Sequence, residues 1–123
     1  MHEMGLAQGI LEVVLDAAAG EKVRRISLRV GRGQMVKPDS LEFSFRLVSE
    51  GTSAAEAAFA LKEVPIRLRC RQCAAETGVD FPPWNCRRCG GSDVEILSGD
   101  EFLVDAVELE SGRIIARRDE DGR

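Results

Sequence analysis

The amino-acid sequence predicts an α+β fold with a small four-cysteine metal module inserted between two strands. Apolar residues recur at helical spacing in two segments and at alternate positions in several others. All four cysteines fall between residues 70 and 89, between two extended segments. A chain of 123 residues is long enough to bury one modest core without disulfides.

The first segment predicts an amphipathic helix that begins close to the N-terminus. Its apolar positions, spaced by three and four residues, are Met4, Ala7, Leu11, Val14 and Ala18. Gly20 follows as a candidate C-cap. Residues 25–30 then alternate polar and apolar side chains, which is typical of a half-buried strand, and Gly31-Arg32-Gly33 ends that strand in a turn.

A second helix is predicted to start at Asp39. Asp39 and Glu42 have the spacing of a capping box. Leu41, Phe45 and Val48 share one apolar face, which ends before the next glycine. Residues 52–61 are rich in alanine and fit either a loop or a short helix.

The remaining segments predict strands on both sides of the cysteines. Residues 64–68 alternate apolar and polar positions, and Pro65 indicates an edge strand. A second extended run starts near residues 94–96. Residues 102–109 are apolar on both faces at first, which is typical of a partly central strand. We expect residues 112–123 to be frayed.

The cysteines form two C-x-x-C pairs, Cys70 with Cys73 and Cys86 with Cys89, separated by twelve residues. Two such turns present four sulfurs to one tetrahedral ion, which suits zinc with Zn–S bonds of roughly 2.3 Å. A redox dithiol, an iron–sulfur cluster and a catalytic zinc are the alternatives. Catalytic zinc keeps an open position, whereas four cysteines fill the shell, so the spacing predicts structural zinc.

The composition predicts a cytoplasmic protein without a membrane segment. Hydrophobic residues make up 44% and charged residues 31%, an ordinary globular balance. No apolar run approaches the roughly 18 to 20 residues needed to span a bilayer, and the first residues lack the basic region of a signal peptide. The net charge of -4 argues against a general nucleic-acid binder.

The first three residues offer a set of nitrogen ligands that could bind a metal ion. The only histidine is His2. The α-amine of Met1, the next backbone amide and the His2 imidazole can form fused chelate rings, and the Glu3 amide can complete a planar set of nitrogens that favours Ni(II) or Cu(II) over zinc. On these residues alone, a simpler alternative stays open: an exposed histidine at a chain end, beside an acid that suits a helix N-terminus.

Together, Met1-His2-Glu3 and the two cysteine pairs resemble the HypA/HybF family of hydrogenase nickel-insertion proteins. The resemblance covers about residues 1–110. It also includes Leu41, Phe45, Gly51-Thr52, Glu63-Val64-Pro65 and Gly99-Asp100-Glu101. It implies a nickel domain of two helices on a three-stranded sheet, expected at residues 1–67 and 97–123, and a zinc ribbon at 68–96.

The resemblance implies a nickel metallochaperone and not an enzyme. The implied partners are the nickel-insertion GTPase HypB and the precursor of the hydrogenase large subunit, with the chain itself a monomer or weak homodimer. Carried over by position, the nickel ligands are the Met1 amine, the His2 imidazole and the His2 and Glu3 amides, with Glu3 and Asp39 tuning the site. Some family members bring a further histidine from the zinc domain, and this sequence has none beyond His2.

The main alternative is a zinc-ribbon module that binds protein or nucleic acid. It rests on the arginines around the cysteines, at positions 67, 69, 71, 87 and 88, and on two aromatic residues that could stack on bases, Phe81 and Trp84. Against it, Arg67 and Arg69 fall on the solvent face of a predicted strand, and both aromatic residues can pack the ribbon core. The arginines can instead dock an acidic partner.

Overall fold

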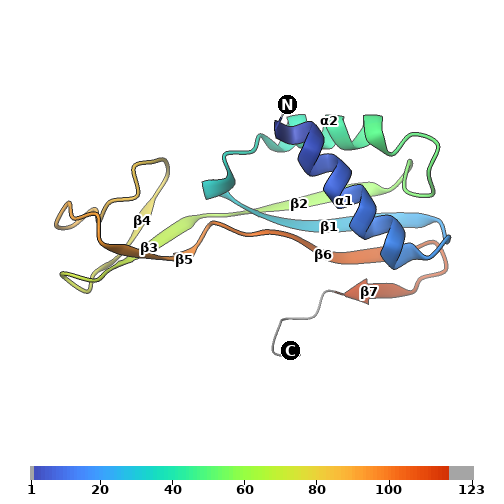
Figure 1. Cartoon of the computed structure of the whole chain (residues 1–123). Helices are drawn as coiled ribbons and strands as arrows, with labels where there is room; N and C mark the ends of the chain where they lie inside the picture. The colour runs from blue at the N-terminus through green and yellow to red at the C-terminus, as the bar shows by residue number, and fades with distance from the viewer. Residues whose placement is uncertain (1, 117–123) are drawn as a thin grey trace. The chain divides into compact units, whose positions relative to one another are not determined.

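The computed structural model describes residues 2–116, and of His2 it describes the backbone only. The fold is α+β, as predicted (Figure 1). Its helices and 3-10 turn are α1 (His2–Ala18), η1 (Arg32–Gln34) and α2 (Pro38–Val48). Its strands are β1 (Val23–Gly31), β2 (Ala58–Val64), β3 (Ile66–Cys70), β4 (Glu76–Val79), β5 (Val94–Ser98), β6 (Phe102–Leu109) and β7 (Ile114–Ala116). None of these helices has the length and apolarity needed to cross a membrane.

The strands form two sheets, one in the order β2-β1-β6-β7 and the other in the order β4-β3-β5. By its internal contacts the chain divides into two compact units. Among the described residues, the first comprises residues 2–28, 36–61 and 103–116, and the second comprises residues 29–35 and 62–102. The second unit therefore takes in residues 29–35, which the sequence did not assign to the cysteine module.

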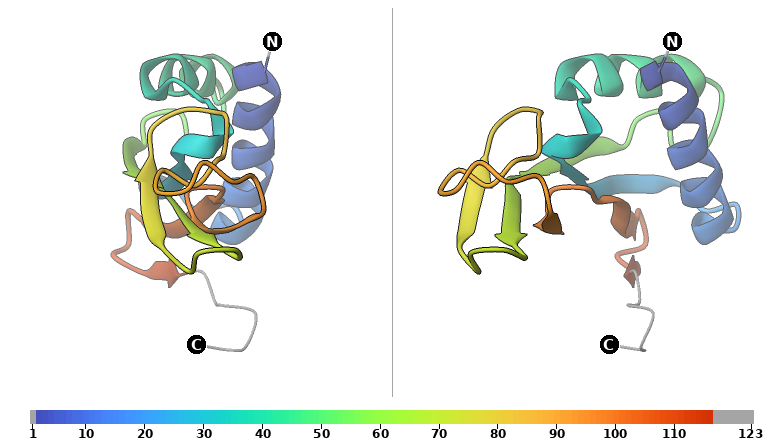
Figure 2. Two further views of the ribbon diagram at one scale, coloured as in Figure 1. Left: turned by 90° about the vertical axis from the view of Figure 1, so that its left-hand side faces the viewer. Right: turned by 60° about the vertical axis from the view of Figure 1, so that its left-hand side comes forward.

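The first unit is built on the buried stripe of α1. Its fully buried members are Ala7, Ile10, Val14 and Ala18, at spacings of three and four residues. Leu11, which the sequence pattern placed in the stripe, is only half-buried. The helix ends as predicted, because Gly20 adopts a φ of 90° that side chains with a Cβ avoid. Helices α1 and α2 pack on each other and cover one face of the four-stranded sheet (Figures 1 and 2).

Helix α2 begins one residue earlier than predicted, at Pro38. Lys37 is the N-cap, and no side chain caps this end. Proline suits the first helical position because its missing N–H has no partner there. The capping box predicted at Asp39 is therefore wrong, and Asp39 instead lies in the first turn. On the inner face Phe45 is fully buried, and its ring centroid lies 5.3 Å from that of Phe59 on β2.

Two strand predictions are corrected at Pro65 and at the C-terminal end. The predicted strand at 64–68 is divided at Pro65, so β2 and β3 belong to different sheets. Proline lacks the N–H that a continuous ladder needs. Residues 114–116 are not frayed, since they form β7 and pair with β6. The sheet thus has four strands instead of three, β6 is central as predicted, and residues 117–123 lie outside the described part.

Within the second unit, three glycines allow a close backbone approach. The Gly31 N–H donates to the Glu101 carbonyl at 2.8 Å, and the Gly33 N–H donates to the Gly99 carbonyl at 2.7 Å. A Cβ on Gly31 would lie 2.1 Å from the Gly99 carbonyl carbon. Gly99 has a φ of 102°, and a Cβ there would lie 2.6 Å from the Ile66 Cα. Glycine is therefore required where this loop meets the connection between β5 and β6.

Phe45→Ala is expected to lower the free energy of unfolding of the first unit by about 3–5 kcal/mol, because it leaves a cavity beneath α2. The matched control is Phe43→Ala on the same helix, whose side chain is 65% exposed, and its effect should stay within about 0.5 kcal/mol. Urea unfolding followed by far-ultraviolet circular dichroism measures both. Equal losses for the two variants would contradict the assigned core.

Gly31→Ala is expected to destabilise the second unit by at least about 2 kcal/mol, because its Cβ would overlap the backbone of Gly99. Gly9→Ala is the control, since no atom lies within 4 Å of a Cβ at that helical position. It should stabilise α1 by about 0.5–1 kcal/mol. Amide hydrogen exchange measures both effects, over residues 62–102 for Gly31→Ala and over α1 for Gly9→Ala. Unchanged exchange in Gly31→Ala would show that the loop can move away.

Candidate metal centre

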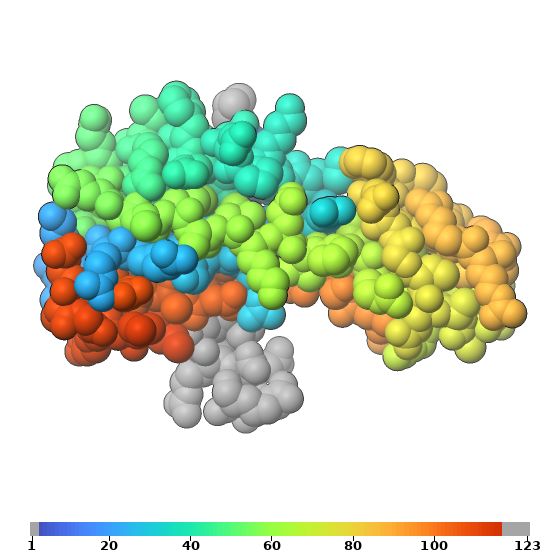
Figure 3. Space-filling view, turned by 180° about the vertical axis from the view of Figure 1, so that it is seen from behind, coloured from blue at the N-terminus to red at the C-terminus, as the bar shows by residue number. Residues whose placement is uncertain are grey.

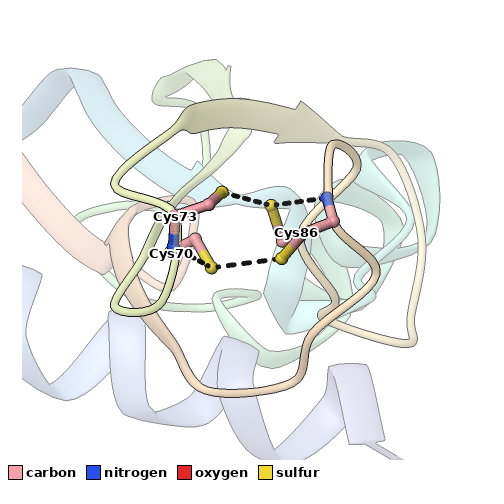
Figure 4. Close-up of side chains that lie close together, drawn as sticks. Cys70, Cys73 and Cys86 are labelled. Atoms are coloured by element: carbon pink, nitrogen blue, oxygen red, sulfur yellow. Dashed lines mark hydrogen bonds between the residues drawn. The ribbon is translucent and has the colours of Figure 1, made fainter.

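Two turns bring the four cysteines together in the second unit. Cys70 is the last residue of β3, and Cys73 lies in the turn that leads to β4. Cys86 and Cys89 lie in the turn that precedes β5. Strands β3 and β5 are antiparallel neighbours, so the ladder holds both turns at the same end of the sheet. Figure 4 shows the sulfur atoms of Cys70, Cys73 and Cys86 turned toward one another.

The four sulfur atoms have the spacing of a tetrahedral site. All lie within 4.8 Å of one another, with Cys70–Cys89 and Cys73–Cys86 separations of 3.6 Å. A tetrahedron with metal–sulfur bonds of roughly 2.3 Å has edges of roughly 3.8 Å. The cysteines therefore fit a single ion with little movement. Among residues 2–116, no other group of three or more His, Cys, Asp or Glu residues is close enough to hold a metal.

The two turns stabilise the thiolates in the same way. Cys70 Sγ accepts the backbone N–H groups of Gln72 and Cys73, each at 3.4 Å. Cys86 Sγ accepts those of Arg88 and Cys89, also at 3.4 Å. Hydrogen bonds to a thiolate favour the charged form. The Cys73 amide, followed by that of Gln72, lowers the pKa of Cys70, and the Cys89 amide is the main cause that lowers the pKa of Cys86 to about 6.

The pKa of Cys89 shifts in the opposite direction, because neighbouring sulfurs disfavour its ionisation. The Gly91 amide acts to lower its pKa, but the Cys70 sulfur, desolvation and the Cys86 sulfur together raise the pKa to about 11. Without a metal, the Cys89 thiol therefore keeps its proton at neutral pH. A bound ion must displace that proton, so metal affinity falls as the pH falls. Cys89 is also the exposed cysteine of the four.

Three of the five arginines near the cysteines form ion pairs with carboxylates within residues 66–98, which we call the ribbon. Arg69 pairs with Glu76 at 3.1 Å and with Glu95 at 3.4 Å. Arg71 pairs with Asp93 at 3.0 Å, and Arg67 reaches Glu76 at 4.0 Å. These exposed pairs contribute little to stability. They do remove the net positive charge on which the nucleic-acid alternative depended.

The ribbon has a small apolar core. Ile66, Leu68 and Val79 are buried, with Trp84 and Val94 packed against them. The expectation that Phe81 also packs there is wrong, because its side chain is 67% exposed. Trp84 is therefore a core residue, whereas Phe81 lies at the surface.

The predicted nickel ligands lie at the edge of the described part. Met1 lies outside it, and His2 is described only as the first residue of α1. Glu3 occupies the first turn of α1 and is partly exposed, and Asp39 is exposed on α2. Within residues 2–116 neither carboxylate has a hydrogen bond or an ion pair. The structure thus brings the four cysteines together and leaves the N-terminal set untested.

Two helices on a sheet, with a four-thiolate ribbon, define a small α+β metal-binding protein. The family model described as "Hydrogenase/urease nickel incorporation, metallochaperone, hypA" matches residues 1–109. The chain therefore belongs to the HypA family of nickel-incorporation metallochaperones, as its sequence motifs predicted.

Relatives and solved structures agree with this family. The hydrogenase maturation factor HypA of Streptomyces avermitilis is 43% identical over 122 residues, which cover 95% of this chain and 93% of the relative. HypA of Nostoc sp. is 36% identical over 110 residues, covering 89% of this chain and 96% of the relative. The solution structure of the Ni metallochaperone HypA from Helicobacter pylori has the same fold, with a TM-score of 0.63 and 18% identity over 89% of this chain and 97% of that one.

Cys73→Ala is expected to abolish metal binding at the cluster and to open residues 66–98 to protease, because metal-binding energy here is folding energy. The helices of the first unit should stay formed. Gln72→Ala, an exposed change in the same turn, keeps all four sulfurs and is the control. Metal analysis combined with limited proteolysis tests this. Full metal content and unchanged protease resistance in Cys73→Ala would refute the role of the cluster.

Proposed function

We propose that the chain binds Ni(II) through its N-terminal residues and delivers it in the cytoplasm during maturation of [NiFe]-hydrogenase. In this proposal it acts as a carrier and not as an enzyme. The recipient is the precursor of the large subunit, and the GTPase HypB is the partner. The observation that carries the proposal is the family match, which begins at residue 1 and so includes Met1, His2 and Glu3. The relatives are named hydrogenase maturation factors, which favours hydrogenase over urease.

In this proposal the cysteine cluster holds structural zinc. Four soft thiolates in a tetrahedral arrangement suit zinc, and they leave no open position for a substrate. Zinc would supply folding energy to a unit whose apolar core is small. The cluster is then fully occupied, and the transported nickel needs a separate set of ligands.

The start of α1 supports a nickel site on the backbone. The helix begins at His2, so the amides of His2 and Glu3 lie in its first turn. N–H groups in the first turn have no acceptor within the helix. These two amides can lose their protons to nickel without breaking a helical hydrogen bond. With the Met1 amine and the His2 imidazole they complete four nitrogen ligands, a set that suits planar Ni(II).

Charge at this end of the helix also supports the proposal. A helix N-terminus carries a partial positive charge and disfavours a bare cation. Two deprotonated amides cancel the charge of Ni(II), so the complex adds no net charge there. Glu3, in the same turn, contributes a further negative charge. The amine and imidazole have reference pKa values of about 7.7–8.0 and 6.5, so protons compete for these ligands and nickel affinity falls as the pH drops toward 6.

We propose no nucleic-acid role for the ribbon. A protein that binds nucleic acid through phosphates needs several unpaired cations on one face. Arg67, Arg69 and Arg71 are instead paired with carboxylates of the same unit. The net charge of the chain is -4, which adds a general repulsion.

A Ni(II) titration of zinc-loaded protein tests the N-terminal site through the absorption of planar diamagnetic nickel. The wild type should bind one nickel, with weaker binding at pH 6 than at pH 8 because the amine and imidazole take up protons. His2→Ala and a variant with one extra residue before Met1 should both lose this binding and keep zinc. Glu3→Ala retains the backbone amide, so it should still bind nickel. Equal binding by the wild type, His2→Ala and the extended variant would place nickel elsewhere.

A further inference from the structure

Two arginines of the second cysteine turn differ from the other arginines of the ribbon. The Arg87 guanidinium donates to the carbonyl oxygen of Phe81 at 3.4 Å and meets no carboxylate. The Arg88 side chain has no hydrogen bond or ion pair among residues 2–116, and both side chains are exposed. In the stretch 66–98 these are the arginines whose charge no acidic side chain offsets. The turn is therefore a local positive region on an acidic protein.

An exposed aromatic residue, Phe81, contacts Arg87 through its backbone carbonyl. Phe81 is 67% exposed, more than any other large apolar side chain in the described part. The bond from Arg87 to the Phe81 carbonyl joins this loop to the turn. The turn itself is closed by a hydrogen bond from the Asn85 side chain to the Gly90 carbonyl at 3.1 Å. The segment from about residue 80 to 90, amber in Figure 3, lies on the surface of its unit.

We propose that Phe81, Arg87 and Arg88, which we call the second-turn patch, dock an acidic segment of a partner protein. An apolar side chain of that segment would cover Phe81, and its carboxylates would pair with the two guanidinium groups. Aromatic residues, including phenylalanine, and arginine are enriched in protein interfaces relative to the rest of the surface. The proposal rests on the proposed function only for the identity of the partners.

Two other roles for the patch fit the structure less well. If the arginines only balanced the charge of the metal cluster, their guanidinium groups would face sulfur. Arg87 instead reaches a carbonyl, and Arg88 contacts Cys86 through its backbone N–H alone. A nucleic-acid surface is disfavoured because the neighbouring ribbon arginines are already neutralised, which leaves two charges for phosphate. Charge complementarity therefore favours an acidic protein.

Calorimetric titration of the full zinc-loaded chain into purified HypB and into the purified large-subunit precursor tests the proposal. The double reversal Arg87→Glu with Arg88→Glu should weaken binding to at least one of them by about tenfold or more and flatten its salt dependence. Phe81→Ala should weaken the same complex by about tenfold with little change in salt dependence. Arg25→Glu with Lys62→Glu makes the same change in net charge at exposed sites on β1 and β2, and it should bind like the wild type.

Zinc content and nickel titration of each variant separate docking from metal binding. Weaker binding with both metals retained supports the docking site even if nickel does not bind at His2. If the reversed variant loses zinc, Arg87→Gln with Arg88→Gln replaces it, and the same weakening is expected. Unchanged affinity in the patch variants would overturn the proposal, as would a wild type that binds neither protein. Salt-sensitive binding of a single-stranded oligonucleotide that depends on Arg87 and Arg88 would also overturn it, in favour of nucleic acid.

Discussion

Four sulfur atoms that lie within 4.8 Å of one another repel each other as they ionise, and a cation between them is what makes this geometry favourable. The pKa shifts of Cys86 and Cys89 are opposed, because the Cys89 backbone amide stabilises the Cys86 thiolate, whereas neighbouring sulfurs and desolvation raise the pKa of Cys89. The apolar cluster of the same unit is small, with Ile66, Leu68 and Val79 as its buried members. Metal binding and folding of this unit are therefore coupled.

Backbone groups contribute as much to this protein as side chains do. The turns direct N–H groups at Cys70 and Cys86, and the loop at Gly31 is held by bonds between main-chain atoms. At the start of α1 the free amides of the first turn are the groups that the proposed nickel site would use. In the turns and at the start of α1, these backbone groups act together with side-chain ligands, and at Gly31 they act without any side chain. Substitutions that preserve side-chain chemistry but move the main chain should therefore be poorly tolerated.

Much of the fold followed from spacing in the sequence. The alternation around Ile26 and the periodicity of α1 predicted the elements of the first unit, and the C-x-x-C pairs predicted that four sulfurs would meet. The errors arose where a local signal was ambiguous. Asp39 has the chemistry of a cap, but Pro38 before it already fits the helix. The alternation at 64–68 continues across Pro65, although the backbone ladder does not.

Other features depended on tertiary contacts that a pattern does not contain. Ile10 is buried in α1 whereas its neighbour Leu11 is only half-buried, and the packing of the helix determines this difference. Phe81 and Trp84 are both aromatic and lie three residues apart, yet Trp84 packs against the apolar cluster and Phe81 is exposed. The pairing of Arg69 with Glu76 and Glu95 required the register of three strands. The positive charge left on Arg87 and Arg88 could not be distinguished before that pairing was known.

The unequal exposure of the cysteines has a kinetic consequence. Cys70 and Cys86 are buried, whereas Cys89 is exposed, so a competing ligand in solution reaches the cluster from the Cys89 side. With an ion bound, Cys89 would be the sulfur that an incoming ligand displaces first. The rate of exchange would then depend on the concentration and size of that ligand. A bulky chelator would remove the ion slowly even when its affinity for the ion is higher than that of the protein.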